Sequence, residues 1–317
     1  MKSITGETAS PLIPKATMGE STSRESECCL SAVNEHIESD MELPHKDLEE
    51  QMWSVLDHAA DAQRRGLRVY ESLQNLNEVI GTEYGDRVLY ELIQNAHDAH
   101  DPGDKGRIAI RLVIQSEMEG VLYVANGGRG FRREDVEAIK NLATSAKEIG
   151  EGIGNKGLGF RSIEALSDDV RIYSRRSAQQ TERFDGYCFR FAETKEIADI
   201  AQSNDIDADT AREVAKTVPR YLVPRPLQQQ PDEVVSYARR DYATVIVAPL
   251  RTADAVDLAS RQVKALVDLE VPLLLFLDRI AEFRVAIDTP DKRTYQHRLN
   301  RSQKALGEVQ NLSLIHI

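Results

Sequence analysis

The stretch Glu91–Asp101, which reads E-L-I-Q-N-A-H-D-A-H-D, decides how the rest of the chain is interpreted. Its apolar residues recur at helical spacing, which predicts a helix buried along one side. The other side carries Glu91, Asn95 and Asp98, at positions i, i+4 and i+7 of that helix. Two carboxylates and an amide oxygen in one row could hold a hydrated magnesium ion and a water molecule to be activated. A plain solvated helix face is the alternative for this helix taken alone.

Glycines gather in two stretches downstream of this helix. Eight of the 18 glycines stand at positions 127, 128, 130, 150, 152, 154, 157 and 159, and clustered glycine lets backbone N–H groups approach a ligand closely. The segment Gly154–Phe160 runs into a predicted helix start, whose free N–H groups and positive potential suit phosphate. Lys147 and Lys156 add positive charge nearby. A tight turn and a flexible linker are the respective alternatives for the two stretches.

Three widespread phosphate-binding motifs do not explain these glycines. The G-x-x-x-x-G-K-[ST] motif is absent. The spacing Gly152-x-Gly154-x-x-Gly157 matches the dinucleotide pattern, but the charged residues before it do not form the strand that this fold requires. A protein kinase would need a lysine-bearing strand and a catalytic Arg-Asp loop, and we find neither.

The hydrophobic pattern predicts an α/β domain. Strands are expected over 108–114, 121–125, 170–174, 187–191, 244–250 and 283–287, the first two as an antiparallel hairpin. Helices are expected over 48–59, 69–80, 84–100 and 256–269, with two short ones between 193 and 216.

Four motifs, taken in order, resemble the GHKL ATPase superfamily. They read E-L-I-Q-N-A-H-D-A, N-G-G-R-G-F, N-L-A-T-S-A-K and I-G-N-K-G-L-G-F-R-S. The resemblance covers about residues 67–250, with a weaker tail to about 287, and is nearest to the sacsin and NO VEIN group and to the ATP-binding domain of heat-shock chaperones. It implies a two-layer Bergerat ATPase sandwich, with a mixed, mostly antiparallel sheet, helices on one face, and ATP and Mg²⁺ bound under a mobile lid.

The resemblance also implies a role for each residue of the motifs. Glu91 matches the general base that activates water, and Asn95 matches the magnesium ligand. Asn126 stands where most members have the adenine-reading Asp, so it would hold adenine more weakly through its side-chain oxygen. Thr244, at the start of a late strand, resembles a threonine that helps to hold adenine, and an ordinary strand threonine is the alternative. The nucleotide-binding positions implied are Asn95, Asp98, Asn126, Gly128, Gly130, Lys147, Gly154, Lys156, Gly157, Leu158, Gly159, Phe160 and Thr244.

Composition bounds the class of protein. The chain has 317 residues and a net charge of −12, which disfavours direct nucleic-acid binding. Three cysteines give no disulfide framework or zinc spacing, and no apolar run could span a bilayer, so we expect a cytoplasmic protein. We expect a disordered acidic leader over 1–44, the ATP-binding domain over 45–250, the truncated start of a following domain over 251–311, and translated sequencing adaptor over 312–317.

These features favour an ATPase module of a larger sacsin- or chaperone-like protein, which couples nucleotide state to lid and domain movement. Its protein client is unknown, and dimerisation remains open. A histidine kinase is the first alternative, but its ATP domain needs no water-activating carboxylate like Glu91. A nucleotide-binding scaffold without turnover, as part of a defence or restriction system, is the second.

Overall fold

The computed structural model describes the backbone of residues 22–75, 85–140, 158–176, 180–268, 273–291, 293–306 and 309–316. Side chains are described from 43 to 301 within these ranges, except at 158 and 159. The chain divides into two units, residues 1–40 and 41–317, and the described strands all belong to the second. Helix α1 spans Thr22–Arg64. Residues 22–44 are therefore helical, which differs from the disordered leader expected over 1–44, and residues 1–21 lie outside the described part.

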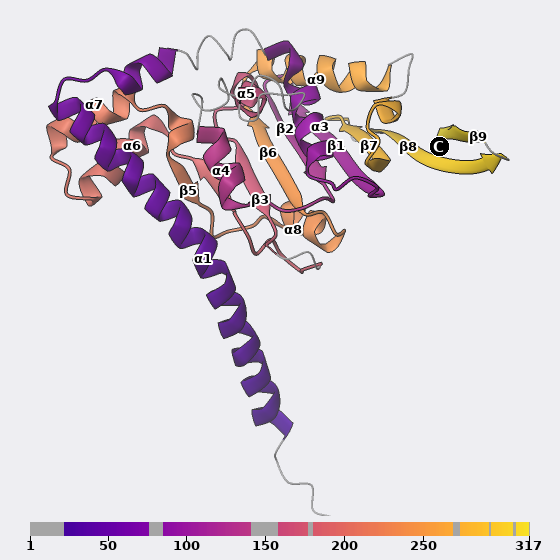
Figure 1. Ribbon diagram of the computed structural model, residues 1–317, viewed down its shortest axis with the longest axis horizontal. Helices are drawn as coiled ribbons and strands as arrows, with labels where there is room; N and C mark the ends of the chain where they lie inside the picture. The colour runs from indigo at the N-terminus through magenta and orange to yellow at the C-terminus, as the bar shows by residue number, and fades with distance from the viewer. Residues whose placement is uncertain are drawn as a thin grey trace, which may run out of the picture. The chain divides into compact units, whose positions relative to one another are not determined.

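A mixed nine-stranded sheet forms the centre of the second unit, in the order β5-β4-β3-β6-β2-β1-β7-β8-β9 (Figure 1). Among the described strand pairs, β1 and β7 run parallel and all other neighbours are antiparallel. The strands are β1 (Gly106–Ser116), β2 (Glu119–Asn126), β3 (Arg171–Ser174), β4 (Phe189–Phe191), β5 (Pro224–Pro226), β6 (Thr244–Leu250), β7 (Ile280–Asp288), β8 (Thr294–Leu306) and β9 (Val309–His316). The predicted hairpin is β1–β2.

One face of this sheet carries the main core. Because side chains alternate along a strand, every second residue of β1, β2 and β6 points to this face, and helices α3 and α9 pack there on β1 and β2. The helices of the unit, besides the end of α1, are α3 (Val88–Asp98), α4 (Arg133–Lys140), α5 (Leu158–Arg161), α6 (Thr194–Ser203), α7 (Ala208–Thr217), α8 (Asp232–Arg239) and α9 (Ala253–Val267). The predicted two-layer α/β sandwich is confirmed.

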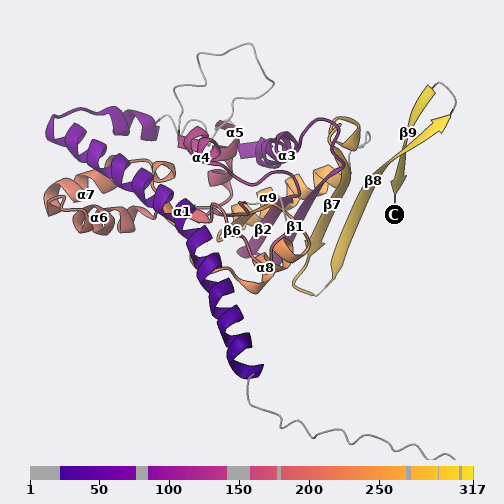
Figure 2. The ribbon, with the colours of Figure 1, turned by 60° about the horizontal axis from the view of Figure 1, so that its bottom comes forward.

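A smaller core covers part of the opposite face. There Ala109, Ala125 and Val245 contact Val234 and Tyr237 of α8, a helix that the sequence pattern did not reveal. Figure 2 shows α3, α4 and α5 on one side of the strands and α8 on the other. The helical layer is therefore supplemented by one short helix on the second face.

The domain boundary expected at residue 250 falls inside this sheet. Helix α9 packs on β1, β2 and β7, and β7 is hydrogen-bonded to β1 from Gly106 to Val113. Strand β8 then pairs with β7. The segment from 251 to 306 is thus part of the same unit, and not the beginning of a separate domain. In the described part of the chain, no helix is long and apolar enough to cross a membrane.

Candidate functional site

Helix α3 is fixed by its buried side and by a cap from a distant helix. Leu89, Leu92 and Ile93 are almost fully buried. The backbone N–H of Leu89, one of the groups without a partner inside the helix, donates to Gln262 Oε1 at 3.0 Å. Gln262 Nε2 donates in turn to the carbonyl of Gly85 at 2.8 Å. Asn95 and Asp98 are thereby presented from a helix held in one orientation.

Two strand ends bring further polar side chains beside α3. Asn126 closes β2 and Thr244 opens β6, and the two are direct partners in the register of the sheet. Both point to the face covered by α3, where Asn126 is 7% exposed and Thr244 is 1% exposed. Thr244 Oγ1 lies 3.3 Å from Ser174 Oγ, which accepts a hydrogen bond from the N–H of Phe131 at 2.6 Å.

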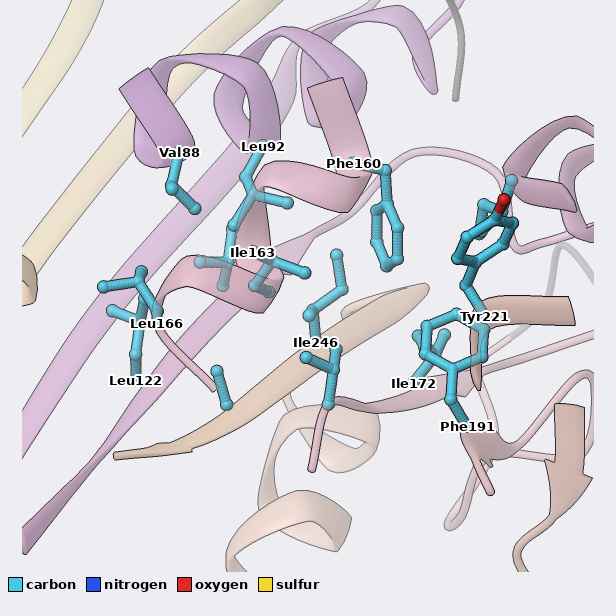
Figure 3. Close-up of a cluster of buried hydrophobic side chains, with 14 of the residues drawn as sticks. Val88, Leu92, Leu122, Phe160, Ile163, Leu166, Ile172, Phe191, Tyr221 and Ile246 are labelled. Atoms are coloured by element: carbon cyan, nitrogen blue, oxygen red, sulfur yellow. The ribbon is translucent and has the colours of Figure 1, made fainter. Parts of the chain in front are cut away.

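These elements enclose one pocket over the end of the sheet. Its floor is formed by β2 and β6, one wall by α3, and the other by α4 and α5. Figure 3 shows the side chain of Phe160 reaching from α5 toward Ile246 of β6. The pocket is lined by Leu92, Asn95, Ala96, Asp98, Ala99, Val124, Asn126, Arg129, Gly130, Phe131, Asp135, Ala138, Ile139, Phe160, Thr244 and Ile246. Five of the predicted nucleotide-binding side chains and Gly130 are thus brought together.

The glycines of the loop after β2 are required by close backbone packing. A Cβ atom at Gly128 would collide with the carbonyl of Ala99, and one at Gly130 would collide with the carbonyl of Arg175. The N–H of Arg129 donates to that same carbonyl of Ala99 at 2.7 Å. The loop is therefore bound to the end of α3. Gly130 also lines the pocket, whereas Gly128 does not.

An ion pair that sequence reasoning missed lies at the wall of the pocket. Arg129 donates through both terminal nitrogens to Asp135, with Nη2 to Oδ1 at 2.8 Å. Burial opposes ionisation of Asp135, but the hydrogen bonds from Arg129 and from the N–H of Arg132 outweigh it and hold the pKa of Asp135 below its ordinary value. The six-residue spacing of an arginine and an aspartate was the only signal, and such spacing is common on protein surfaces.

A buried arginine joins the two ends of the glycine-rich segment. Arg161, 2% exposed, donates from Nε and Nη2 to the carbonyl of Ile139, at 3.0 and 2.5 Å. Its guanidinium lies 3.6 Å above the ring centroid of Tyr221, an arrangement in which the ring attracts the cation. Burial lowers the pKa of Arg161. Since Ile139 and Phe160 both line the pocket, Arg161 sets the distance between its α4 and α5 walls.

The remaining predicted site residues are not among the described residues that line the pocket. Glu91 is partly buried on α3, one turn before Asn95, and is not among the residues that line the pocket. Lys147, Gly154, Lys156 and Gly157 lie outside the described residues. Leu158 and Gly159 begin α5, where only their backbone is described. Within the described part, no group of three or more His, Cys, Asp or Glu side chains is arranged to hold a metal ion.

Comparison with known proteins gives distant similarities. No family model matches the chain. Protein NO VEIN of Arabidopsis thaliana is 25% identical over 224 residues, which are 69% of this chain and 7% of that protein. Chaperone protein HtpG of Rhodospirillum rubrum is 32% identical over 137 residues, 33% of this chain and 21% of that protein. The chain thus matches only a small part of either relative, and one of the two is a chaperone.

Among solved structures, the N-terminal domain of a DNA repair protein aligns over 66% of this chain and 50% of that one. The identity is 14% and the TM-score is 0.31.

Proposed function

We propose that this chain is a magnesium-dependent ATP-binding module of the GHKL type, which hydrolyses ATP within a larger sacsin- or chaperone-like protein. One observation carries the proposal. Asn95, Asn126 and Thr244, separated by up to 149 residues in the sequence numbering, line a single pocket between a sheet and a helix. The distant similarity to a chaperone agrees with it.

The pocket has two chemically different ends. Near the sheet, apolar side chains such as Val124, Ile246 and Phe160 surround Asn126 and Thr244, which suits a flat purine base. On α3, Asn95 and the more exposed Asp98 offer oxygen atoms to the polar part of the ligand. The Asn95 oxygen is of the hard type that Mg²⁺ prefers, and phosphate oxygens and water would complete its shell. Bound magnesium would neutralise phosphate charge.

Hydrolysis assigns a role to Glu91. As a carboxylate one helical turn from Asn95, it would accept a proton from the attacking water. The position of Glu91 outside the lining of the pocket favours a second candidate function, a nucleotide-binding scaffold without turnover. Phosphate release from saturated protein distinguishes the two, because the scaffold would bind ATP and release none.

Calorimetric titration with ATP, with and without Mg²⁺, tests the binding function. The wild-type chain should bind ATP with Mg²⁺ more tightly than without it. Asn95→Ala should lose this gain from Mg²⁺, because the substitution removes one metal ligand. A matched control is Asn204→Ala, which removes a surface amide between α6 and α7. Failure of the wild-type chain to bind ATP would refute the proposed function, and a full Mg²⁺ gain in Asn95→Ala would refute the assignment of Asn95.

A further inference from the structure

The side chain of Asn126 is oriented by its own turn. Asn126 Oδ1 accepts a hydrogen bond from the N–H of Gly128 at 3.2 Å, the pattern of an Asx turn. This contact decides which end of the amide is the oxygen, because a backbone N–H needs an acceptor. Gly128 is in turn held against the carbonyl of Ala99, with no room for a Cβ atom. The amide therefore cannot rotate without losing this hydrogen bond.

The other end of the amide is the hydrogen-bond donor Nδ2. Among the described residues, Nδ2 of Asn126 donates to no side chain or carbonyl, and it is not one of the fully buried polar atoms without a partner. Asn126 is one of the residues that line the pocket, and 7% of its surface stays exposed. The pocket floor thus offers an N–H₂ group at a position where a carboxylate would offer only acceptors.

The hydroxyl groups beside Asn126 do not select for a ligand group that donates a hydrogen bond. Thr244 and Ser174 are joined through their hydroxyl groups, either of which could be the donor, and a hydroxyl can both donate and accept. Thr244 can therefore adapt to a ligand group of either kind. Asn126 alone has an orientation fixed by the backbone, and so it decides which ligand atom is favoured beside it.

We propose that Asn126 presents a hydrogen-bond donor to position 6 of a purine, so that 6-oxopurine nucleoside triphosphates bind at least as tightly as ATP; this rests on the nucleotide-binding function proposed above. Hypoxanthine and guanine carry an acceptor oxygen at position 6, which matches Nδ2, whereas adenine carries an amino group there, which is also a donor. ATP still binds, because Nδ2 can reach the acceptor N1 of adenine after a small displacement of the base. A pocket that binds the adenine amino group through a carboxylate prefers adenine over 6-oxopurines. In this pocket we expect that preference to be weaker or reversed.

ITP is the sharpest probe, because hypoxanthine has the size of adenine and lacks the 2-amino group of guanine. The dissociation constants of ITP and ATP are measured on the wild-type chain by calorimetry with Mg²⁺. We expect the dissociation constant of ITP to be equal to that of ATP or up to about tenfold lower. A tenfold difference corresponds to one matched neutral hydrogen bond. ATP binding more tightly than ITP would overturn the inference while leaving nucleotide binding intact. Failure of both nucleotides to bind would overturn the nucleotide-binding function itself.

Asn126→Asp replaces the donor by a second acceptor and tests the residue directly. The ratio of the ITP to the ATP dissociation constant should shift toward ATP by about tenfold or more, because hydrogen bonds to a charged group are stronger. Any general repulsion of the phosphates cancels in this ratio. Gln296→Glu, an amide-to-carboxylate change at an exposed position of β8, is the control and should leave the ratio unchanged. An unchanged ratio in a folded Asn126→Asp protein would overturn the inference, and the wild-type ratio decides the matter if that variant does not fold.

Discussion

Replacing Gln262 by leucine should weaken the attachment of α3 to α9. Gln262 is 7% exposed, and its amide makes two hydrogen bonds, with Leu89 N–H at 3.0 Å and with the Gly85 carbonyl at 2.8 Å. Each such bond stabilises a fold by about 0.5–1.5 kcal/mol net, and a buried group left without a partner costs about 1–3 kcal/mol. Leucine has a similar volume and buries additional apolar surface, which offsets part of the loss. We therefore expect the free energy of unfolding to fall by about 2 kcal/mol.

Chemical denaturation with urea measures this change. For a unit of this size, a loss of about 2 kcal/mol should also lower the melting temperature by roughly 4–8 °C. Gln202→Leu, at an exposed position of α6, is the control and should change the free energy of unfolding by no more than about 0.5 kcal/mol. If both variants unfold alike, the hydrogen bonds of Gln262 do not stabilise the attachment of α3 to α9.

Two further predictions concern hydrolysis and pH. Glu91→Gln should keep ATP affinity but slow phosphate release in single-turnover experiments by roughly 10²–10⁴-fold, because an amide cannot accept the proton from water; an unchanged rate would exclude Glu91 as the base. Hydrogen bonds from Arg190 lower the pKa of Glu196 from its ordinary 4.5 to about 2. The ionised carboxylate therefore stabilises the fold at pH values above the pKa that Glu196 has in the unfolded chain, and this stabilisation disappears as the pH falls through about 2. The difference in unfolding free energy between wild type and Glu196→Gln should therefore be largest above about pH 5 and shrink toward pH 2; a difference that is independent of pH would contradict the lowered pKa.

The sequence predicted those parts of the fold that depend on local periodicity. The β1–β2 hairpin, the strand β6 and the amphipathic α3 all follow from alternating or helical apolar patterns, and each is present. The placement of Asn126 and Thr244 in one nucleotide site was implied only by the resemblance of the motifs to the GHKL ATPase superfamily. The sheet register makes the two residues direct partners on neighbouring strands.

What the sequence did not predict depends on contacts between distant segments. The parallel pairing of β1 with β7 leaves no local signal, so the boundary was expected at 250. The apolar run Leu273–Leu277 has no clear sequence signal for burial either, because Leu274 is buried whereas Phe276 is 72% exposed and Leu275 is 42% exposed. Likewise, the orientation of the Asn126 amide depends on the hydrogen bond that its Oδ1 accepts from the N–H of Gly128. A sequence pattern gives the residue type but not the direction of its amide.

The two ends of α3 explain why the pocket and the last strands belong to one unit. Gln262 of α9 caps the beginning of the helix, and Arg279, just before β7, donates to the carbonyl of His100 at 2.9 Å beyond its end. His97 Nε2 lies 2.7 Å from Asp278 Oδ1, while its Nδ1 lies 3.2 Å from Oδ1 of Asp98 in the pocket wall. A ligand that displaced α3 would therefore have to break or carry along contacts on both sides of the helix. Because Gln262, Asp278 and Arg279 all lie after residue 250, we expect a displacement of α3 to be accompanied by a displacement of β7.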